Sequence, residues 1–438
     1  MRIHQVPVQS LLVVMVLLVT GLRVPASEFT AVLGDEIAAG ECHPENQYQC
    51  DVRAAPDGRT WAVTAKSKTK ETETVVLLSA DAGVTWRARV VPQSSDPDCI
   101  FAEDGSLHVS VISKRDKDRV GYLRSPDGGL TWDERRTVPC AVDHPHLAVD
   151  RGAASERRGA IYLAGRLFSN KGVAVATSLD GGDTWTVTKH DLGAQLNKGF
   201  VQNVAVADDG TLLIGIRGKN NILSKNGSYA GNSVHLAVLR SDDGGASLQV
   251  VKLGTLDQGA NSGPGGMFPV SLALHRLGAG ERAYYLTSNK RPAPQPAGLW
   301  LRHSDDLGQT WSEPRALHPS LPEGLGVGQA DLVTNDQGLV CIRYYATISE
   351  VSGEKDPQYP PYYVYAMASA DGGMTFSEPV QLNTQALPFS PWGYQRRVLG
   401  GDQNFSCALP DGSFLFAWTD TRSKHPNYQI YLRRVRFE

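Results

Sequence analysis

Four arginines stand at matching places along the chain, each at the end of a short apolar stretch: Arg166, Arg217, Arg343 and Arg422. A planar guanidinium group can donate two parallel hydrogen bonds to one carboxylate. If these side chains converge on one cavity, they would hold an acidic sugar by its carboxylate group. If each arginine instead pairs with a neighbouring acid, the four form a structural ring of ion pairs. The residues leave both interpretations open.

The elements that position these arginines are indicated by an internal repeat. Six copies of a turn close to Ser-x-Asp-x-Gly-x-Thr-Trp, here called the Asp box, start at intervals of 46, 53, 63, 63 and 65 residues. Its Asp accepts hydrogen bonds from backbone N–H groups, its Gly supplies a positive φ, and its aromatic residue packs against the sheet. The fourth copy alone lacks the aromatic residue. The copies are Ser79–Trp86, Ser125–Trp132, Ser178–Trp185, Ser241–Leu248, Ser304–Trp311 and Ser369–Phe376.

A second repeat is present in seven units rather than six. Each unit has a short alternating run, an Asp-Gly type of turn and an apolar run, as in Asp98–Gly105 followed by Leu107–Val111. With the Asp box added, the order is strand, turn, strand, connection, strand, box, strand, which predicts a four-stranded antiparallel sheet. The sequence therefore predicts an all-β fold, a β-propeller with seven blades. Six blades are the alternative if the fifth unit is not a blade.

The seventh unit ends with Gln429–Phe437 and has no fourth strand of its own. An incomplete blade would leave sheet edges exposed. The segment from Phe29 to Ile37 precedes the first unit, and we expect it to supply the missing strand and close the ring. Because no linker-like stretch interrupts the repeats, we expect a single propeller domain over residues 27–438.

Alignment of the units places a polar residue at the start of the first strand in most blades. In a propeller the first strands line a central channel, so these side chains would form a polar ring around one mouth of that channel. The four arginines, at the ends of the second strands, would lie at the same mouth. The ring residues are Asp51, Asp98, Asp143 with His144, Asn203, Asp331 and Asn404.

These motifs resemble the sialidase (neuraminidase) superfamily of Asp-box, or BNR-repeat, propellers, over nearly the whole chain. The chain is most similar to the bacterial secreted sialidase-like group, through Asp143–Asp150, Gly401–Gly412 and Ala417–Arg422. The resemblance implies that the boxes lie on the outer rim between the third and fourth strands, and that their aspartates are structural. It also implies an exported glycosidase of the exo-α-sialidase type, acting on an acidic glycan at the channel mouth.

The resemblance further implies a tyrosine nucleophile activated by a carboxylate, and a separate carboxylate that acts as acid and base. Tyr345 and Glu350 are candidates for the first pair, and Asp98 or Asp143 for the acid/base. Other tyrosines, Tyr344 and Tyr394, fit the pattern too, and each tyrosine has the structural alternative of packing between blades. The substrate-binding candidates are Arg166, Arg217, Arg343, Arg422, His144 and Asp402. The alternative function is a non-catalytic propeller that binds a glycan or a protein at the same mouth.

His144 and His146 suggest two further kinds of chemistry. Alternation along a strand places both rings on one face, where a histidine could act as the general base of a polysaccharide lyase. A metal ion needs three or four ligands, and only Asp143 is an obvious third, so we expect no metal. Nothing in the sequence indicates a cofactor.

The N-terminus and the composition define the expected location and partners. Residues 1–26 combine Arg2, the apolar run Leu11–Val19 and the small-residue end Val24–Ala26, which predicts a cleaved signal peptide and a secreted or periplasmic protein. No later stretch is apolar enough to span a membrane. Cleavage takes the formal charge from -3 to -5, which argues against nucleic acid as a partner. We expect a monomer with a glycan or glycoconjugate as its substrate, and a Cys42–Cys50 disulfide as the nearest local pairing.

Overall fold

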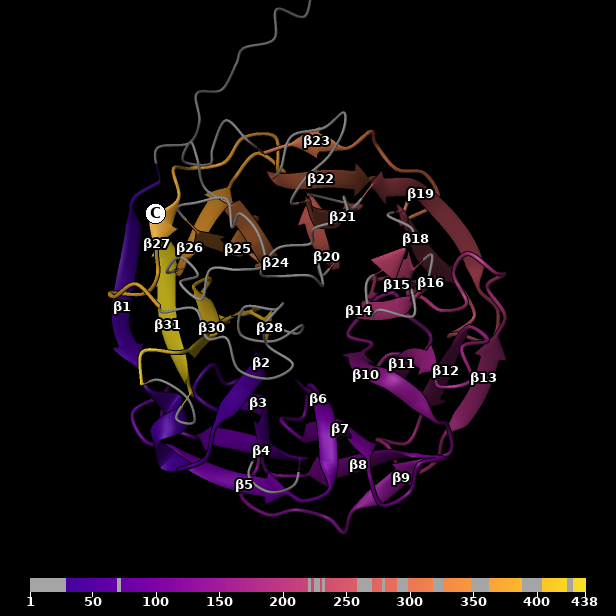
Figure 1. The fold of residues 1–438 in the computed structure, drawn as a ribbon, viewed down its shortest axis with the longest axis horizontal. Helices are drawn as coiled ribbons and strands as arrows, with labels where there is room; N and C mark the ends of the chain where they lie inside the picture. Colours follow the sequence, from indigo (N-terminus) through magenta and orange to yellow (C-terminus); the bar gives the residue numbers. More distant parts are fainter. Residues whose placement is uncertain are drawn as a thin grey trace, which may run out of the picture.

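The fold is a closed ring of seven β-sheets, shown down the ring axis in Figure 1. The computed structural model describes residues 29–68, 72–219, 222–223, 229–230, 233–257, 270–277, 280–289, 298–317, 326–347, 362–387, 404–423 and 428–438. The sheets are numbered here as blades 1 to 7 in chain order. The seven predicted units each form one blade, which confirms the prediction of seven rather than six.

In each of blades 1 to 6 the chain runs from the inner to the outer strand. Blade 1 is β2 (Gln47–Ala54), β3 (Trp61–Lys68), β4 (Thr72–Ser79) and β5 (Arg87–Val91), with β28 (Asn404–Phe405) added in parallel to β2. Blade 2 is β6 (Ser94–Phe101), β7 (Leu107–Ser113), β8 (Val120–Ser125) and β9 (Arg136–Val138). Blade 3 is β10 (Val142–Val149), β11 (Ile161–Leu167), β12 (Val173–Ser178) and β13 (Thr186–His190).

The remaining blades follow the same order. Blade 4 is β14 (Phe200–Val206), β15 (Leu212–Lys219), β18 (Ser233–Ser241) and β19 (Gln249–Asp257), with a hairpin of β16 (Ile222–Leu223) and β17 (Tyr229–Ala230) inserted. Blade 5 is β20 (Val270–Leu277), β21 (Gly280–Asn289), β22 (Gly298–Ser304) and β23 (Arg315–Ala316). Blade 6 is β24 (Gly326–Thr334), β25 (Val340–Thr347), β26 (Tyr362–Ser369) and β27 (Val380–Gln381).

Blade 7 combines the two ends of the chain. Its inner strands are β29 (Cys407–Ala408), β30 (Phe414–Asp420) and β31 (Gln429–Phe437), and its outermost strand is β1 (Ala31–Ile37). β1 pairs antiparallel with β31, from Ala31 opposite Phe437 to Ile37 opposite Leu432. The prediction that Phe29–Ile37 closes the ring is confirmed, and a short 3-10 helix at Ala39–Cys42 follows β1.

Apolar side chains fill the spaces between neighbouring blades rather than one central core. There are seven clusters of buried residues, and each one joins two adjacent blades. The cluster between blades 6 and 7, for example, contains Tyr345 and Tyr362 on one side and Phe416 and Trp418 on the other. Because burying apolar area is the main favourable term in folding, each blade is stabilised only by its two neighbours. A ring without a gap is therefore the stable arrangement.

The Asp boxes are turns at the outer rim, between the third and fourth strands. In blade 3, Ser178 Oγ donates to Asp180 at 2.8 Å and accepts from the Gly182 N–H, while Asp180 accepts from the Thr184 hydroxyl at 2.6 Å. These hydrogen bonds, that from Thr184 foremost, hold the pKa of Asp180 at about 2. A Cβ on Gly182, which has φ +91°, would lie 2.0 Å from the Tyr122 hydroxyl of blade 2. The box therefore packs directly on the preceding blade, and its aspartate is structural.

Candidate functional site

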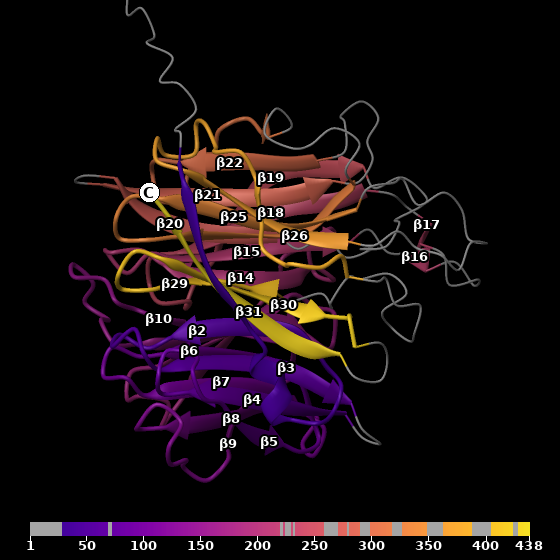
Figure 2. The same cartoon turned by 90° about the vertical axis from the view of Figure 1, so that its left-hand side faces the viewer.

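One end of the channel, called the mouth here, is where the first strand of each blade begins and the second strand ends. The β16–β17 hairpin, which follows the second strand of blade 4, projects on this side of the ring (Figure 2). The Asp-Gly turns and Asp boxes lie at the opposite end. Most of the predicted site residues fall on the first and second strands near this mouth.

Four residues of the predicted polar ring, Asp51, Asp98, Asn203 and Asp331, lie on first strands and bond to backbone groups outside their own strands. The carboxylate of Asp98 in blade 2 accepts the backbone N–H of Leu147 in blade 3 at 2.8 Å. Asn203 of blade 4 exchanges two hydrogen bonds with the backbone of Leu272 in blade 5, at 2.6 and 3.0 Å. Asp331 of blade 6 accepts the Ser406 N–H of blade 7, and Asp51 of blade 1 accepts the Phe405 N–H. These side chains join blade 2 to blade 3, blade 4 to blade 5 and blade 6 to blade 7, and Asp51 holds β28 on blade 1.

A β-bulge lies two residues before these inner-ring positions in several first strands. Four residues in the bulges have a left-handed backbone although they are not glycine: Gln49 (φ 57°), Asp96 (φ 46°), His144 (φ 53°) and Gln329 (φ 52°). A non-glycine residue in this conformation costs free energy, which the surrounding structure must offset. Asp96 and His144 each precede a proline, which restricts the backbone still further. The same strained bulge is thus built at the mouth in four blades.

The bulge also sets the level at which the second strands meet the first. The inner-ring residues of blades 1, 3 and 4 are Asp51, His146 and Asn203. They lie opposite Thr64, Ala164 and Gly215, respectively. Two residues further along each second strand, on the same face, stand Lys66, Arg166 and Arg217. Arg343 instead lies directly opposite Asp331, one step deeper in the channel. Lys66, which was not predicted, therefore shares a level with Arg166 and Arg217, and Arg343 does not.

Arg166 pairs with the residue opposite it. Its Nη2 forms an ion pair with Asp143, its Nη1 donates to Asn170 at 2.6 Å, and its guanidinium lies 4.2 Å from the centre of the Phe200 ring of blade 4. The side chains of Arg166 and Asp143 keep 15% and 17% of their accessible surface. The pair is thus partly open to solvent between blades 3 and 4. Arg217, opposite Phe200, is buried.

Lys66 and Asp96 form a second ion pair, between blades 1 and 2. Lys66 Nζ lies 2.6 Å from Asp96 Oδ1 and 5.9 Å from the centre of the Tyr48 ring. Burial raises the pKa of Asp96, but the charges of Lys66 and His144 outweigh burial, so its pKa lies below the usual value. Asp96 is therefore an ionised carboxylate at neutral pH.

His144 stands between the two ion pairs. Its Nε2 lies 3.9 Å from Asp143 Oδ1, and its ring packs edge-on against Phe200 with the ring centres 5.4 Å apart. The His144 and His146 rings are stacked with their centres 6.5 Å apart, so the two histidines do lie side by side as predicted.

A buried layer lies beneath His144. His146 Nδ1 is 3.6 Å from Asp98, whose other oxygen is 3.4 Å from Arg53 Nη2. Burial raises the pKa of Asp98, but the contact with His146 and the charge of Arg53 outweigh burial and leave its pKa below the usual value. Asp98 is 1% exposed. Asp98, one of the two predicted candidates for the acid/base residue, is therefore ionised, enclosed and already bonded to its neighbours.

Tyr345 and Arg343 are also enclosed. Tyr345 is completely buried between blades 6 and 7, where its ring packs edge-on against Tyr362 with the centres 5.4 Å apart. Arg343 is also completely buried, and its guanidinium lies 5.0 Å from the centre of the Tyr345 ring. Burial raises the pKa of Tyr345 above its usual value. The structure therefore places the predicted nucleophile within the packing of two blades.

Arg422 lies apart from Arg166, Asp143 and His144. Its Nη2 is 2.7 Å from Asp420 and 3.1 Å from Glu36 on the closing strand β1, which is the outermost strand of blade 7. For Arg422 the structure thus matches the second interpretation, a structural ion pair. Glu350, Asp402 and Tyr394 lie outside the described residues.

The mouth cluster is defined here as Lys66, Asp96, Asp143, His144, Arg166 and Phe200. The prediction contained Asp143, His144 and Arg166 but missed Lys66, Asp96 and Phe200. A usable signal was present in the sequence: Asp96-Pro97-Asp98 and His144-Pro145-His146 are the same bulge in neighbouring blades. The correspondence of Asp96 with His144 appears only when blade 3 is aligned on His146 instead of Asp143.

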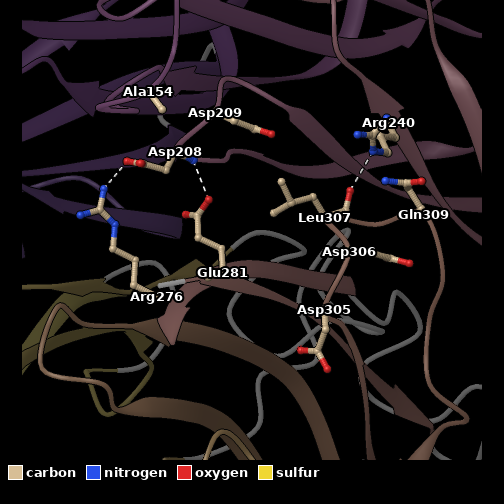
Figure 3. A pocket seen from close by; sticks show the side chains of 11 residues that line it. Ala154, Asp208, Asp209, Arg240, Arg276, Glu281, Asp305, Asp306, Leu307 and Gln309 are labelled. Atoms are coloured by element: carbon tan, nitrogen blue, oxygen red, sulfur yellow. Dashed lines mark hydrogen bonds and ion pairs between the residues drawn. The ribbon is translucent and has the colours of Figure 1, made fainter. Parts of the chain in front are cut away.

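A pocket of about 550 Å³ opens at the opposite end of the blades and is shown in Figure 3. Its charged groups are largely engaged with one another. Arg276 forms an ion pair with Asp208, Glu281 accepts the Asp208 N–H at 2.6 Å, and Arg240 Nε donates to the Leu307 carbonyl. These bonds connect blades 4 and 5 and parts of their turns, so the pocket is a by-product of blade packing.

Neither disulfides nor metal-binding groups are found in the described part of the chain. All six cysteines there are free, so the predicted Cys42–Cys50 bond is wrong. Cys50 is buried in the inner strand of blade 1, whereas the Cys42 thiol lies on the 3-10 helix and donates to the Ala39 carbonyl at 3.3 Å. Among the described residues no three His, Cys, Asp or Glu side chains are arranged to hold a metal ion. The same residues contain no helix that is both long and apolar enough to cross a membrane.

The closed ring of Asp-box blades defines a BNR-repeat β-propeller. Residues 46–284 match the family model described as BNR repeat-like domain, and because this is more than half of the chain, the protein belongs to that family. No match was found among curated proteins.

Several solved structures are similar to this chain. The Hadza microbial sialidase Hz136 is 16% identical, with 85% of this chain and 75% of that one covered and a TM-score of 0.46. The Trypanosoma rangeli sialidase in complex with sialic acid is 13% identical, with 79% and 59% covered and a TM-score of 0.45. The intramolecular trans-sialidase from Ruminococcus gnavus in complex with oseltamivir carboxylate is 12% identical, with 91% and 96% covered and a TM-score of 0.43.

Proposed function

We propose that this protein is an exported, sialidase-like glycoside hydrolase that acts on a carboxylate-bearing glycan at the channel mouth. The observation that carries the proposal is the shared level of Lys66, Arg166 and Arg217 on the second strands of blades 1, 3 and 4. Three cations at one level around the ring axis favour an anionic ligand.

Recognition would rest on exchange of partners at the Arg166–Asp143 pair. Arg166 is held over the Phe200 ring and by its bond to Asn170, so its guanidinium group is already positioned and loses little freedom on binding. A sugar carboxylate would approach the partly exposed side of this guanidinium. Lys66, partly exposed as well, would bind a second polar group of the glycan as a point charge.

The chemistry belongs to the groups around Asp143 rather than to Tyr345. Asp143 and Asp96 are partly exposed carboxylates on either side of His144, whereas Tyr345 and Asp98 are buried. Tyr48, beside Lys66 and only partly buried, is a tyrosine of the described residues that lies at the mouth. Glycosidases use a pair of acidic groups on either side of the bond that breaks.

The test is turnover by the purified protein of an aryl α-sialoside, followed by arrays of uronic and sulfated glycans. Release of the aglycone from an acidic sugar, and none from neutral sugars, is the expected result. If no substrate is turned over, the enzymatic proposal is rejected.

The second candidate is a propeller that binds a glycan at the same mouth without cleaving it. It is favoured by the burial of Tyr345 and by the bonds of Asp98 to three neighbours, which leave two of the predicted catalytic groups enclosed. Retention of acidic glycans on the array without any bond cleavage would identify this function.

A further inference from the structure

His144 belongs to the mouth cluster, where it contacts Asp143 and Phe200. It sits at a strained bulge position with φ 53°, followed by Pro145. Gln49, Asp96 and Gln329 occupy the same place in blades 1, 2 and 6, so the bulge itself accepts other polar residues. Strain of this kind persists where the surrounding structure imposes it, and it is concentrated at functional sites.

The contacts of His144 fix its ring from several sides. Phe200 of blade 4 packs against its edge, His146 stacks on it, and Asp143 lies 3.9 Å from Nε2. A ring held by the Asp143 carboxylate and two aromatic neighbours is oriented for proton transfer, and 8% of the side chain is still exposed at the mouth.

We propose that His144 is the general acid of the hydrolase, which protonates the leaving oxygen of a glycoside whose carboxylate is bound by Arg166. This inference rests on the proposed function and assigns a residue that the family resemblance does not. Arg166 and His144 both contact Asp143 and both pack on Phe200, so the carboxylate-binding group and the proton donor are neighbours.

The reaction requires His144, Asp96 and one water molecule. A ring N–H of His144 gives its proton to the glycosidic oxygen while the bond from that oxygen to the anomeric carbon breaks, and its electron pair stays on the oxygen. Water adds through its oxygen to the anomeric carbon and gives one proton to Asp96, which the Lys66 ammonium keeps ionised. The proton on Asp96 returns through solvent to His144, and both groups are restored.

The leaving group provides a direct test of this role. An acid is needed when the leaving oxygen is a sugar hydroxyl, and it is hardly needed when the leaving group is a nitrophenolate, which departs without protonation. We would compare His144→Asn with wild type on a nitrophenyl glycoside and on an oligosaccharide of the same acidic sugar. Loss of about 100-fold or more on the oligosaccharide, with the nitrophenyl substrate within about 10-fold of wild type, is expected.

Two further measurements separate acid catalysis from a structural role. His144→Gly suits the left-handed backbone and leaves a space, so added imidazole should restore part of the oligosaccharide activity. In wild type, the pH profile of oligosaccharide cleavage should differ from that of nitrophenyl glycoside cleavage, because only the oligosaccharide needs a proton on its leaving oxygen. The charged and titratable groups around His144 that shape this profile are Asp96, Asp98, Lys66, Asp143, His146 and Arg166.

The matched control is His190→Asn, on the outer strand of the same blade, where His190 Nε2 bonds the Gly245 carbonyl. It should leave both substrates unaffected. If His144→Asn slows both substrates equally, or slows neither, the assignment of His144 is overturned while the hydrolase stands. If wild type cleaves neither substrate, the proposed function itself fails and this assignment fails with it.

Discussion

Asp51 and Asp98, on the inner strands of neighbouring blades, are two completely enclosed carboxyl groups whose pKa values are shifted in opposite directions. Burial, together with the negative charge of Asp98, raises the pKa of Asp51 well above its usual value. Asp98 has Arg53 and His146 as partners, and its pKa lies below the usual value. Because the two pKa values are shifted in opposite directions, the two carboxyl groups should affect stability with opposite dependence on pH.

Asp51→Asn should make the protein more stable than wild type at pH 8. An Asp side chain in an unfolded chain has a pKa of about 3.9. Because folding raises the pKa of Asp51, the contribution of Asp51 to the free energy of unfolding is greatest below the unfolded pKa. This contribution declines as pH rises from the unfolded pKa toward the folded pKa. Asn cannot ionise and keeps an acceptor for the Phe405 N–H. The urea midpoint of Asp51→Asn, relative to wild type, should increase from pH 5 to pH 8.

The control for this comparison is Asp118→Asn, at an exposed loop position of blade 2. Its difference from wild type should stay the same at both pH values. A wild type that gains stability relative to Asp51→Asn as pH rises would show that Asp51 is ionised in the fold.

Asp98→Asn should have the opposite effect. The substitution leaves Arg53 and His146 without the carboxylate they contact, and removing one partner of a buried ion pair costs about 3–5 kcal/mol of unfolding free energy. Because the folded pKa of Asp98 is depressed, the loss should be complete at pH 7 and shrink as pH falls below the unfolded pKa. Urea unfolding at pH 7 and at pH 2.5, which is below the unfolded pKa, measures both. An equal loss at the two pH values would contradict the charged state assigned to Asp98.

The fold was predictable because the Asp box depends on local chemistry. Ser178, Asp180 and Thr184 bond to one another within seven residues, so the turn leaves a complete signature in the sequence. Counting these turns and the units before them gives the blades and the missing strand. The Cys42–Cys50 pairing failed because sequence proximity says nothing of the direction of two side chains on different elements.

The site was only partly predictable, because its geometry depends on the bulges. Arg166 lies opposite Asp143, on the mouth side of the bulge in β10, whereas Arg343 lies opposite Asp331, beyond the bulge in β24. The two arginines therefore look equivalent from the ends of their strands but meet the inner ring at different depths. The pair of Lys66 and Asp96 joins two blades over a separation of 30 residues. No spacing within one unit indicates such a contact.

Glu36→Ala should weaken closure of the ring. Glu36 on β1 contacts Arg422 at 3.1 Å, Arg433 at 3.8 Å and the Thr384 hydroxyl at 3.0 Å, and its side chain is 11% exposed. Loss of a mostly buried carboxylate that holds two arginines should cost about 3 kcal/mol of unfolding free energy. Asp35→Ala, the exposed neighbour on the same strand, should cost little. Equal urea midpoints for the two variants would show that Glu36 does not secure β1.

Arg166→Ala should reduce the affinity for acidic glycans by about 10- to 100-fold, since a charged hydrogen bond to a carboxylate contributes a few kcal/mol. Arg166→Lys keeps the charge but loses the planar fork and the contact with Phe200, so it should recover only part of the affinity. The expected order of affinity is wild type, then Arg166→Lys, then Arg166→Ala. Calorimetric titration of each protein with an acidic oligosaccharide measures these affinities.

Arg282→Ala serves as the matched control for Arg166, because Arg282 forms an ion pair with Asp305 at the opposite end of the blades. It should bind the glycan as wild type does. The Arg166 effect should also weaken as salt is raised, because the site remains partly exposed to solvent. Should Arg166→Ala bind as tightly as wild type while its urea midpoint is unchanged, the carboxylate is bound elsewhere, and the shared level of Lys66, Arg166 and Arg217 is a matter of blade packing alone.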